Sequence, residues 1–137
     1  MRTITAVGLS MAFFTLSAWS QDERPACELL PVKRVSAIVG MAVHVDAGRS
    51  AEAELQPNIC IYRGPGVAIR FSIRTSNSEI AARSDYAQQV AEVFSGMPHQ
   101  LLRGVGAEAR FGARDKPRSG VIVARYDTIV MVLSGSQ

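Results

Sequence analysis

A short apolar segment at the N-terminus determines which part of this chain folds and in which compartment it does so. Arg2 precedes the uncharged segment Ile4–Phe14, and small residues then lead to a polar stretch that begins at Gln21. This layout is typical of a secretory signal peptide, and the apolar segment is too short for a comfortable membrane span. We therefore expect residues 1–20 to be a signal peptide, cleaved near Ser20 and Gln21, which places the mature protein in the periplasm or outside the cell.

Two cysteines constrain the fold of the remaining part, residues 21–137, which has the length of one domain. Because an exported domain with an even cysteine count is typically cross-linked, Cys27 and Cys60 are expected to form a disulfide. Closing a loop of this length would contribute roughly 3.5–4 kcal/mol to stability. Reactive thiols or a metal site are the alternative, but the chain has no C-x-x-C motif and its two histidines lack ligand spacing.

The charge balance and the position of the first cysteine argue against two classes of partner. The formal net charge is only +3, from 15 basic and 12 acidic residues, which is too small a surplus for a nucleic-acid-binding surface. A lipoprotein needs a cysteine directly after its cleavage site, whereas Cys27 follows Arg24-Pro25-Ala26. We expect no nucleic-acid partner and no stable membrane anchor.

Hydrophobic periodicity predicts the element order helix, three strands, helix, three strands. The first helix is expected over Leu29–Val39, with Pro31 in its first turn. The second follows a capping box of Ser76 and Glu79, and Ile80 begins its buried stripe. The segments expected to form strands are Met41–Val45, Ile59–Tyr62, Val67–Ile73, Ala107–Phe111, Val121–Tyr126 and Thr128–Leu133.

Together these elements predict an α+β fold. Since tight turns join several neighbouring strands, the pairing is expected to be mainly antiparallel. A six-stranded, mainly antiparallel sheet with two helices on one face, in the order α-β-β-β-α-β-β-β, is the simplest arrangement that buries both apolar helix stripes. The polar segment Ala47–Asn58 and the basic segment Gly112–Gly120 are expected to be loops.

Three segments carry motifs in a characteristic order. Ala26–Leu30 reads A-C-x-L-L, Ile59–Tyr62 contains a cysteine followed two residues later by an aromatic, and Gly104–Phe111 reads G-x-G-x-x-A-x-aromatic. Together they resemble an uncharacterised family of small secreted and lipoprotein domains of bacteria. The resemblance implies a sheet-plus-helices fold with the cysteines in a disulfide, and it brings no catalytic residues. The chain departs from the family at Pro31, where a Ser or Thr helix cap is usual, and it has no lipobox.

Groups suited to catalysis are few, and no G-x-S-x-G or H-E-x-x-H motif is present. His44 and Asp46 share one face of a predicted strand, and His99 follows Pro98 in a predicted loop; surface histidines are the plainer interpretation. The carboxylate pairs to weigh for glycoside cleavage are Glu52 with Glu54 and Asp85 with Glu92. Nothing else in the sequence supports either pair, so we assign no catalytic, cofactor-binding or metal-binding residue.

Arginine offers the remaining candidates for binding. Arg70 and Arg74 share the outward face of one predicted strand, whereas the orientation of Arg125 is left open. The predicted Gly112–Gly120 loop carries the basic residues Arg114, Lys116 and Arg118. Because arginine grips carboxylates and phosphates with two parallel hydrogen bonds, these residues are candidates for binding an anion or a partner. The plainer interpretation is that they keep an open sheet face hydrated.

These observations favour an exported, non-enzymatic interaction domain that binds another envelope or secreted protein. An immunity protein or inhibitor of an exported toxin would be a special case. The alternative is a periplasmic protein that binds a small ligand or an anion, with Ala47–Asn58 as a lid. A cell-wall hydrolase is a third hypothesis, and it would need clustered acids or a histidine–carboxylate pair in a cleft.

Overall fold

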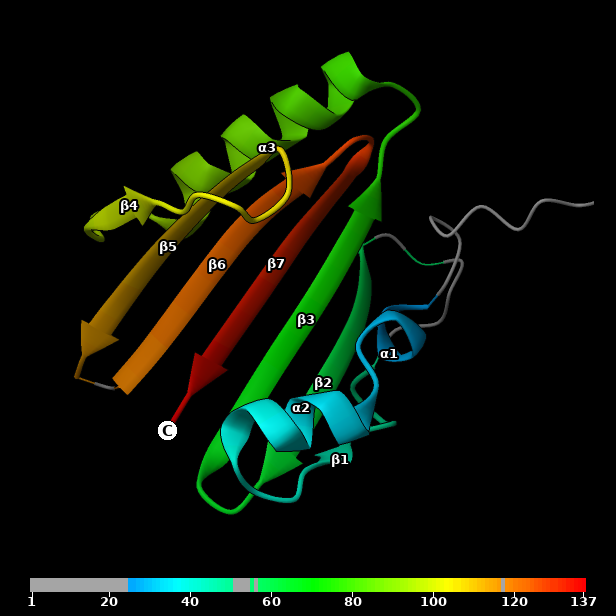
Figure 1. Ribbon diagram of the computed structural model, residues 1–137, viewed down its shortest axis with the longest axis vertical. Helices are drawn as coiled ribbons and strands as arrows, with labels where there is room; N and C mark the ends of the chain where they lie inside the picture. Colours follow the sequence, from blue (N-terminus) through cyan, green and yellow to red (C-terminus); the bar gives the residue numbers. More distant parts are fainter. Residues whose placement is uncertain (1–24, 51–54, 56, 117) are drawn as a thin grey trace, which may run out of the picture.

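The structure is a computed structural model that describes residues 25–50, 55, 57–116 and 118–137. Within these residues, seven strands form one antiparallel sheet in the order β1-β2-β3-β7-β6-β5-β4 (Figure 1). The helices are α1 (Ala26–Leu29), α2 (Val32–Val39) and α3 (Glu79–Val93). The strands are β1 (His44–Val45), β2 (Asn58–Gly64), β3 (Val67–Thr75), β4 (His99–Leu101), β5 (Glu108–Asp115), β6 (Arg118–Tyr126) and β7 (Ile129–Ser136). The predicted α+β class and antiparallel pairing are confirmed.

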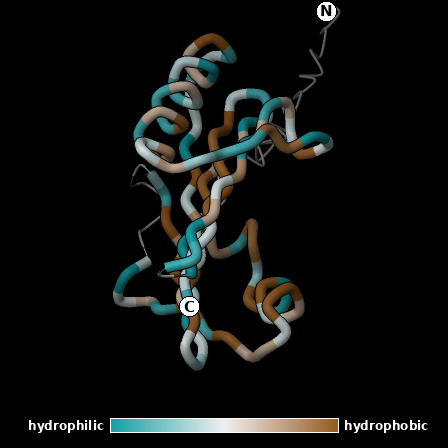
Figure 2. Tube along the Cα trace, turned by 90° about the vertical axis from the view of Figure 1, so that its left-hand side faces the viewer, coloured by the Kyte–Doolittle hydropathy of each residue, from teal (hydrophilic) through white to brown (hydrophobic). Residues whose placement is uncertain are grey.

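The helices lie on opposite faces of the sheet, so the prediction that they share one face is wrong. Phe71 and Met131 pack with residues of α1 and α2 on what we call the α1 face. Val123 and Val130 pack with α3 on the α3 face. Figure 2 shows α2 and α3 on opposite sides of the sheet. The sheet carries buried apolar side chains on both faces, with Tyr62 and Phe71 of β2 and β3 on the α1 face and Val123 and Val130 of β6 and β7 on the α3 face, so each face has helices packed on it.

Pro31 divides the first predicted helix into α1 and α2, so the two predicted helices correspond to three helical segments among the described residues. Leu30 adopts φ −122° and ψ 83°, and Pro31 precedes α2 with extended backbone. The ring of a proline disfavours helical backbone in the residue before it and removes one N–H donor. The chain therefore breaks at Leu30 instead of accommodating Pro31 in a first turn.

The sheet gains a seventh strand and a long hairpin that the sequence analysis assigned to loops. The short strand β4, at His99–Leu101, pairs with β5 at one edge of the sheet. The predicted loop Gly112–Gly120 is mostly strand, since β5 runs to Asp115 and β6 begins at Arg118. Charged residues favour a loop in the sequence, but long arginine side chains are readily hydrated on an open sheet face and so are compatible with strands.

The N-cap of helix α3 lies two residues later than predicted, at Ser78 instead of Ser76. The Ser78 hydroxyl, not that of Ser76, accepts a hydrogen bond from the Ala81 N–H at 3.1 Å. The Ser76 N–H donates to the carbonyl of Thr128 at 2.8 Å instead, continuing the sheet. The buried face of the helix also differs from the predicted stripe: Ala82 and Tyr86 are buried, whereas Ile80, expected to be buried, is 82% exposed.

The predicted disulfide is present between Cys27 and Cys60, which are separated by 33 positions. It ties α1 to the centre of β2, where Cys60 is fully buried. Two polar contacts reinforce this attachment: the Tyr62 hydroxyl donates to the Leu30 carbonyl, and the Ala26 N–H donates to the Asn58 side-chain oxygen. Helix α1 is only four residues long, so these links rather than its own hydrogen bonds hold it in place. The predicted signal peptide lies outside the described residues.

Candidate binding surfaces

An apolar groove with a volume of about 450 Å³ lies on the α1 face. Its floor is formed by β6 and β7 and its sides by α1 and the loop between β4 and β5. The residues that line this apolar groove are Leu29, Leu30, Phe71, Val105, Ile122, Ala124, Tyr126, Asp127, Ile129, Met131 and Leu133. Almost all of them are hydrocarbon in character, so the groove suits apolar side chains or an aliphatic group.

The floor of the apolar groove follows directly from strand register. Phe71, Leu133 and Ile122 are cross-strand neighbours on β3, β7 and β6, and Met131 lies opposite Ala124. Helices α1 and α2 lie over β2 and β3 rather than over β5 and β6 (Figure 1). The apolar side chains of β6 and β7 on this face are therefore only partly covered and form an exposed apolar patch.

A glycine lets the β4–β5 loop close over one side of the apolar groove. Gly106 has φ +58°, and a Cβ there would lie 2.5 Å from the carbonyl oxygen of Arg125. The N–H of Ala107 donates to that same carbonyl at 2.8 Å, which anchors the loop on β6. Any side chain at position 106 would push the loop away. The loop brings Val105 to the rim, where it is 42% exposed beside Tyr126 at 63%.

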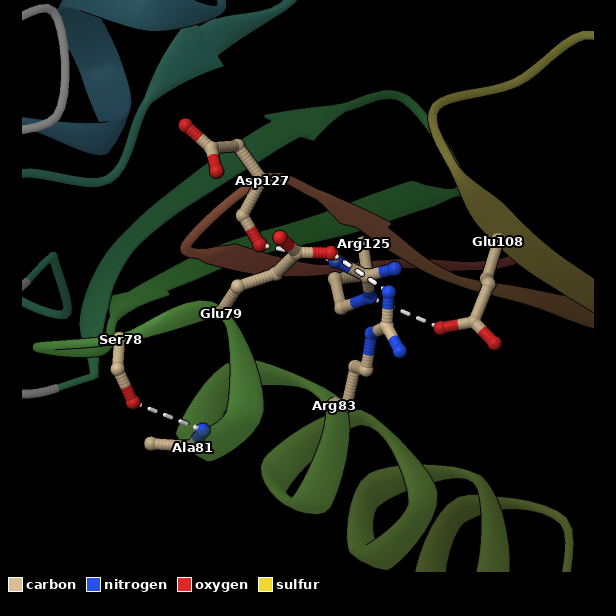
Figure 3. Close-up of polar contacts among 7 residues, drawn as sticks. All are labelled: Ser78, Glu79, Ala81, Arg83, Glu108, Arg125 and Asp127. Atoms are coloured by element: carbon tan, nitrogen blue, oxygen red, sulfur yellow. Dashed lines mark hydrogen bonds and ion pairs between the residues drawn. The ribbon is translucent and has the colours of Figure 1, made fainter.

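A buried guanidinium holds the β6–β7 turn that carries Asp127 (Figure 3). Arg125 lies on the α3 face, is 4% exposed, and donates through Nε to Glu108 at 2.8 Å. Its Nη1 donates to the Asp127 carbonyl at 3.0 Å and lies 3.7 Å from a Glu79 oxygen, which also accepts from Arg83 at 2.8 Å. The network joins the β6–β7 turn to the start of α3. It thereby positions Asp127 and the adjacent rim of the groove.

The basic residues predicted as candidates do not form one patch. Arg70 and Arg74 do share the α3 face of β3, as expected, and Arg74 donates to Asp85 of α3 at 3.0 Å. Arg114 and Arg118 belong to the β5–β6 hairpin, opposite Ser119 and Asp115 respectively. Because side chains alternate along a strand, Arg114 points to the α3 face and Arg118 to the α1 face. Lys116 lies in the exposed turn between these strands.

Asp46 and His99, two of the residues considered for catalysis, each contact other side chains. Asp46 accepts a hydrogen bond from Arg63 Nε at 2.8 Å, and this bond holds the pKa of the Asp46 carboxyl below its usual value. The His99 ring stacks on Phe94 with centroids 4.7 Å apart, and its Nδ1 lies 3.2 Å from Arg110.

Of the two carboxylate pairs weighed for glycoside cleavage, only Asp85 and Glu92 lie in the described parts of the chain, and each has another partner. Asp85 is paired with Arg74, and Glu92 accepts from Gln88 at 2.9 Å. Glu52 and Glu54 lie outside the residues that the structure describes. In the described ranges, no cluster of three or more histidine, cysteine or acidic residues is arranged to hold a metal ion.

Comparison of the chain with family models, with curated proteins and with solved structures finds no match. Among the described residues, no helix is both long enough and apolar enough to cross a membrane. Function is therefore inferred from the residues on the two faces of the sheet.

Proposed function

We propose that this chain is an exported, non-enzymatic binding domain that uses its apolar groove to bind another envelope or secreted protein. The observation that carries the proposal is the 450 Å³ groove itself, lined by side chains such as Leu30, Ile122 and Leu133. Burial of apolar surface is the dominant favourable contribution to most protein associations, at roughly 25 cal/mol per Å². A domain that leaves this much of its inner sheet face uncovered is suited to completing its core with a partner.

The rim of the groove has the composition of a protein interface. Tyr126 offers a large aromatic surface with a hydroxyl at its tip, and Val105 lies beside it on the anchored loop. Protein interfaces typically combine an apolar centre, aromatic anchors and a polar rim. Asp127 supplies an acidic group at the rim of this groove. We therefore expect the partner to insert apolar side chains and to place polar or basic groups near Asp127.

Export is supported by the cross-link between Cys27 and Cys60, because disulfides persist in oxidising compartments. A non-enzymatic role is supported by the engagement of the polar side chains. Asp46 is bonded to Arg63 and Arg125 to Glu108, so these charges hold the fold together. The polar side chains that line the groove are Tyr126 and Asp127, and among the residues that the structure describes neither is paired there with a base or nucleophile.

A small apolar ligand is the second candidate for the same groove. Its volume of about 450 Å³ lies within the usual range for small-molecule sites, about 300–1,000 Å³. Native mass spectrometry of purified protein separates the two, because a bound small molecule would add a fixed mass in the absence of any other protein.

The test compares a variant of the groove rim with a matched variant elsewhere. Val105→Asp places a charge at the apolar rim on a loop, while Ile80→Asp replaces an 82% exposed residue of α3 on the opposite face. Both remove one exposed aliphatic side chain and add one charge. We expect the identified partner to bind wild-type protein and Ile80→Asp equally and to bind Val105→Asp at least tenfold more weakly, as measured by calorimetry after quantitative capture from envelope extract. Equal binding to Val105→Asp would exclude the groove.

A further inference from the structure

The α3 face carries a second hollow of about 240 Å³, between β3 and α3, with a different chemistry from the apolar groove. Arg70, Ser72 and Arg74 alternate along β3 and so point to the same side of the sheet. Asp85 and Gln89 of α3 border the hollow opposite them. Polar and charged groups thus converge from two elements that are not adjacent in the sequence.

The hollow retains one positive charge without an acidic partner. Arg74 is compensated by Asp85 at 3.0 Å, as Arg63 is by Asp46 and Arg125 by Glu108. Arg70 is exposed and makes no ion pair or hydrogen bond within the described part of the chain. A guanidinium presents donors in a fixed fork that matches a carboxylate or a phosphate. Arg70 is therefore the basic residue of this hollow that is available to an anion.

A buried hydroxyl lies between the two arginines. Ser72 is only 5% exposed and lines the hollow. Ser72 lies between Arg70 and Arg74 on one strand and lines the same hollow, so its hydroxyl can donate to a ligand there.

Apolar side chains form the remaining walls. Val93 of α3 and Val130 and Val132 of β7 line the hollow beside the polar groups. An inorganic anion would leave these walls without contacts, whereas a ligand with a short hydrocarbon part would cover them. The hollow is too small for a drug-sized molecule.

We propose that this hollow binds a small carboxylate ligand with a short aliphatic chain. Arg70 grips the carboxylate with two parallel hydrogen bonds, the Ser72 hydroxyl donates a third, and the three valines contact the hydrocarbon. The site lies on the opposite face from the apolar groove. The carboxylate proposal is therefore independent of the proposed protein binding and can be tested separately.

The experiment is a titration of the mature protein with sodium butyrate, followed by ¹H–¹⁵N NMR at constant ionic strength, with inorganic phosphate as a parallel arm. We expect saturable shifts for amides of β3 near Ser72 and of α3 near Gln89. Arg70→Gln should weaken butyrate binding at least tenfold. Arg114→Gln is the matched control, since it removes an exposed arginine from the same sheet face outside the hollow; it should leave the affinity within twofold.

A second variant tests the hollow without changing charge. Ser72→Val removes the hydroxyl and fills space, so it should abolish the saturable shifts while the spectrum elsewhere stays folded. Equal loss in Arg70→Gln and Arg114→Gln would show nonspecific attraction and overturn the site. Non-saturable or absent shifts with butyrate would also overturn it, as would tighter binding of phosphate at the same amides. Val105→Asp should bind butyrate with unchanged affinity, which would show that butyrate does not bind in the apolar groove on the other face.

Discussion

At the scale of single residues, Arg125 shows how a charge that the sequence leaves unplaced acquires a structural role. Alternation along β6 puts it on the side of Val121 and Val123, where a lone guanidinium would be costly to bury. The Arg125 guanidinium is stabilised by contacts with Glu108, Glu79 and the Asp127 carbonyl, which belong to three other segments. Sequence reasoning could not find this network, because its partners lie up to 46 positions away from Arg125 and no local pattern connects them.

Replacing Arg125 with methionine is expected to destabilise the domain by about 2 kcal/mol, because charge-assisted hydrogen bonds to Glu108 and to the Asp127 carbonyl are lost. The loss stays moderate since Glu79 and Glu108 are half exposed and can be hydrated. Urea unfolding measures this. Arg83→Met is the control: its side chain is 64% exposed, so the change should cost less than 0.5 kcal/mol. Equal effects of the two variants would contradict the assigned role.

At the scale of elements, features that depend on the local sequence pattern could be predicted, whereas features that depend on tertiary packing could not. The alternation of β3 correctly placed Arg70 and Arg74 on one face, and the cysteine count correctly predicted the disulfide. Two neighbouring serines were equally plausible caps for α3, and only packing against the sheet selects Ser78 over Ser76. The apolar groove was not predicted, because periodicity identifies apolar side chains without showing which of them a helix will leave uncovered.

The disulfide between Cys27 and Cys60 should affect both the stability of the domain and the position of α1. Since Cys27 anchors a four-residue helix that forms one side of the apolar groove, the double variant Cys27→Ala, Cys60→Ala should lose both stability and binding. We expect a loss of roughly 3–4 kcal/mol in urea unfolding and a weakening of partner binding of at least tenfold at temperatures where the variant is still folded. Full binding by the folded double variant would show that the contacts of Tyr62 and Ala26 alone keep α1 in place.

At the scale of the whole molecule, two apolar clusters pack on opposite faces of one sheet, and the stability of the folded domain should depend on alkaline pH. Tyr62 is fully buried beneath α1, and burial raises the pKa of its hydroxyl to about 12 from an ordinary value near 10. The folded state therefore holds this proton more tightly than the unfolded chain. This contribution to stability is complete below pH 10 and is lost as the pH rises from 10 towards 12.

Urea unfolding midpoints measured from pH 8 to 11.5 test this dependence. Wild-type protein should lose stability above pH 10, with a slope of at most about 1.4 kcal/mol per pH unit from Tyr62. Tyr62→Phe should be less stable at pH 8, because the bond to the Leu30 carbonyl is lost, and should show a shallower alkaline decline. Tyr126→Phe, at a 63% exposed position, should follow the wild-type curve. Identical slopes for wild type and Tyr62→Phe would assign the decline to other groups.

The borders of the sheet have a consequence for how this molecule meets its neighbours. Its outermost strands are β1, with two residues, and β4, with three. Beyond β4, the unpaired end of β5 carries Arg114 and Asp115. Short strands and charged residues at a sheet margin hinder another chain from extending the ladder. Fibril-like growth by strand addition is thereby discouraged, and encounters are directed to the broad sides of the molecule.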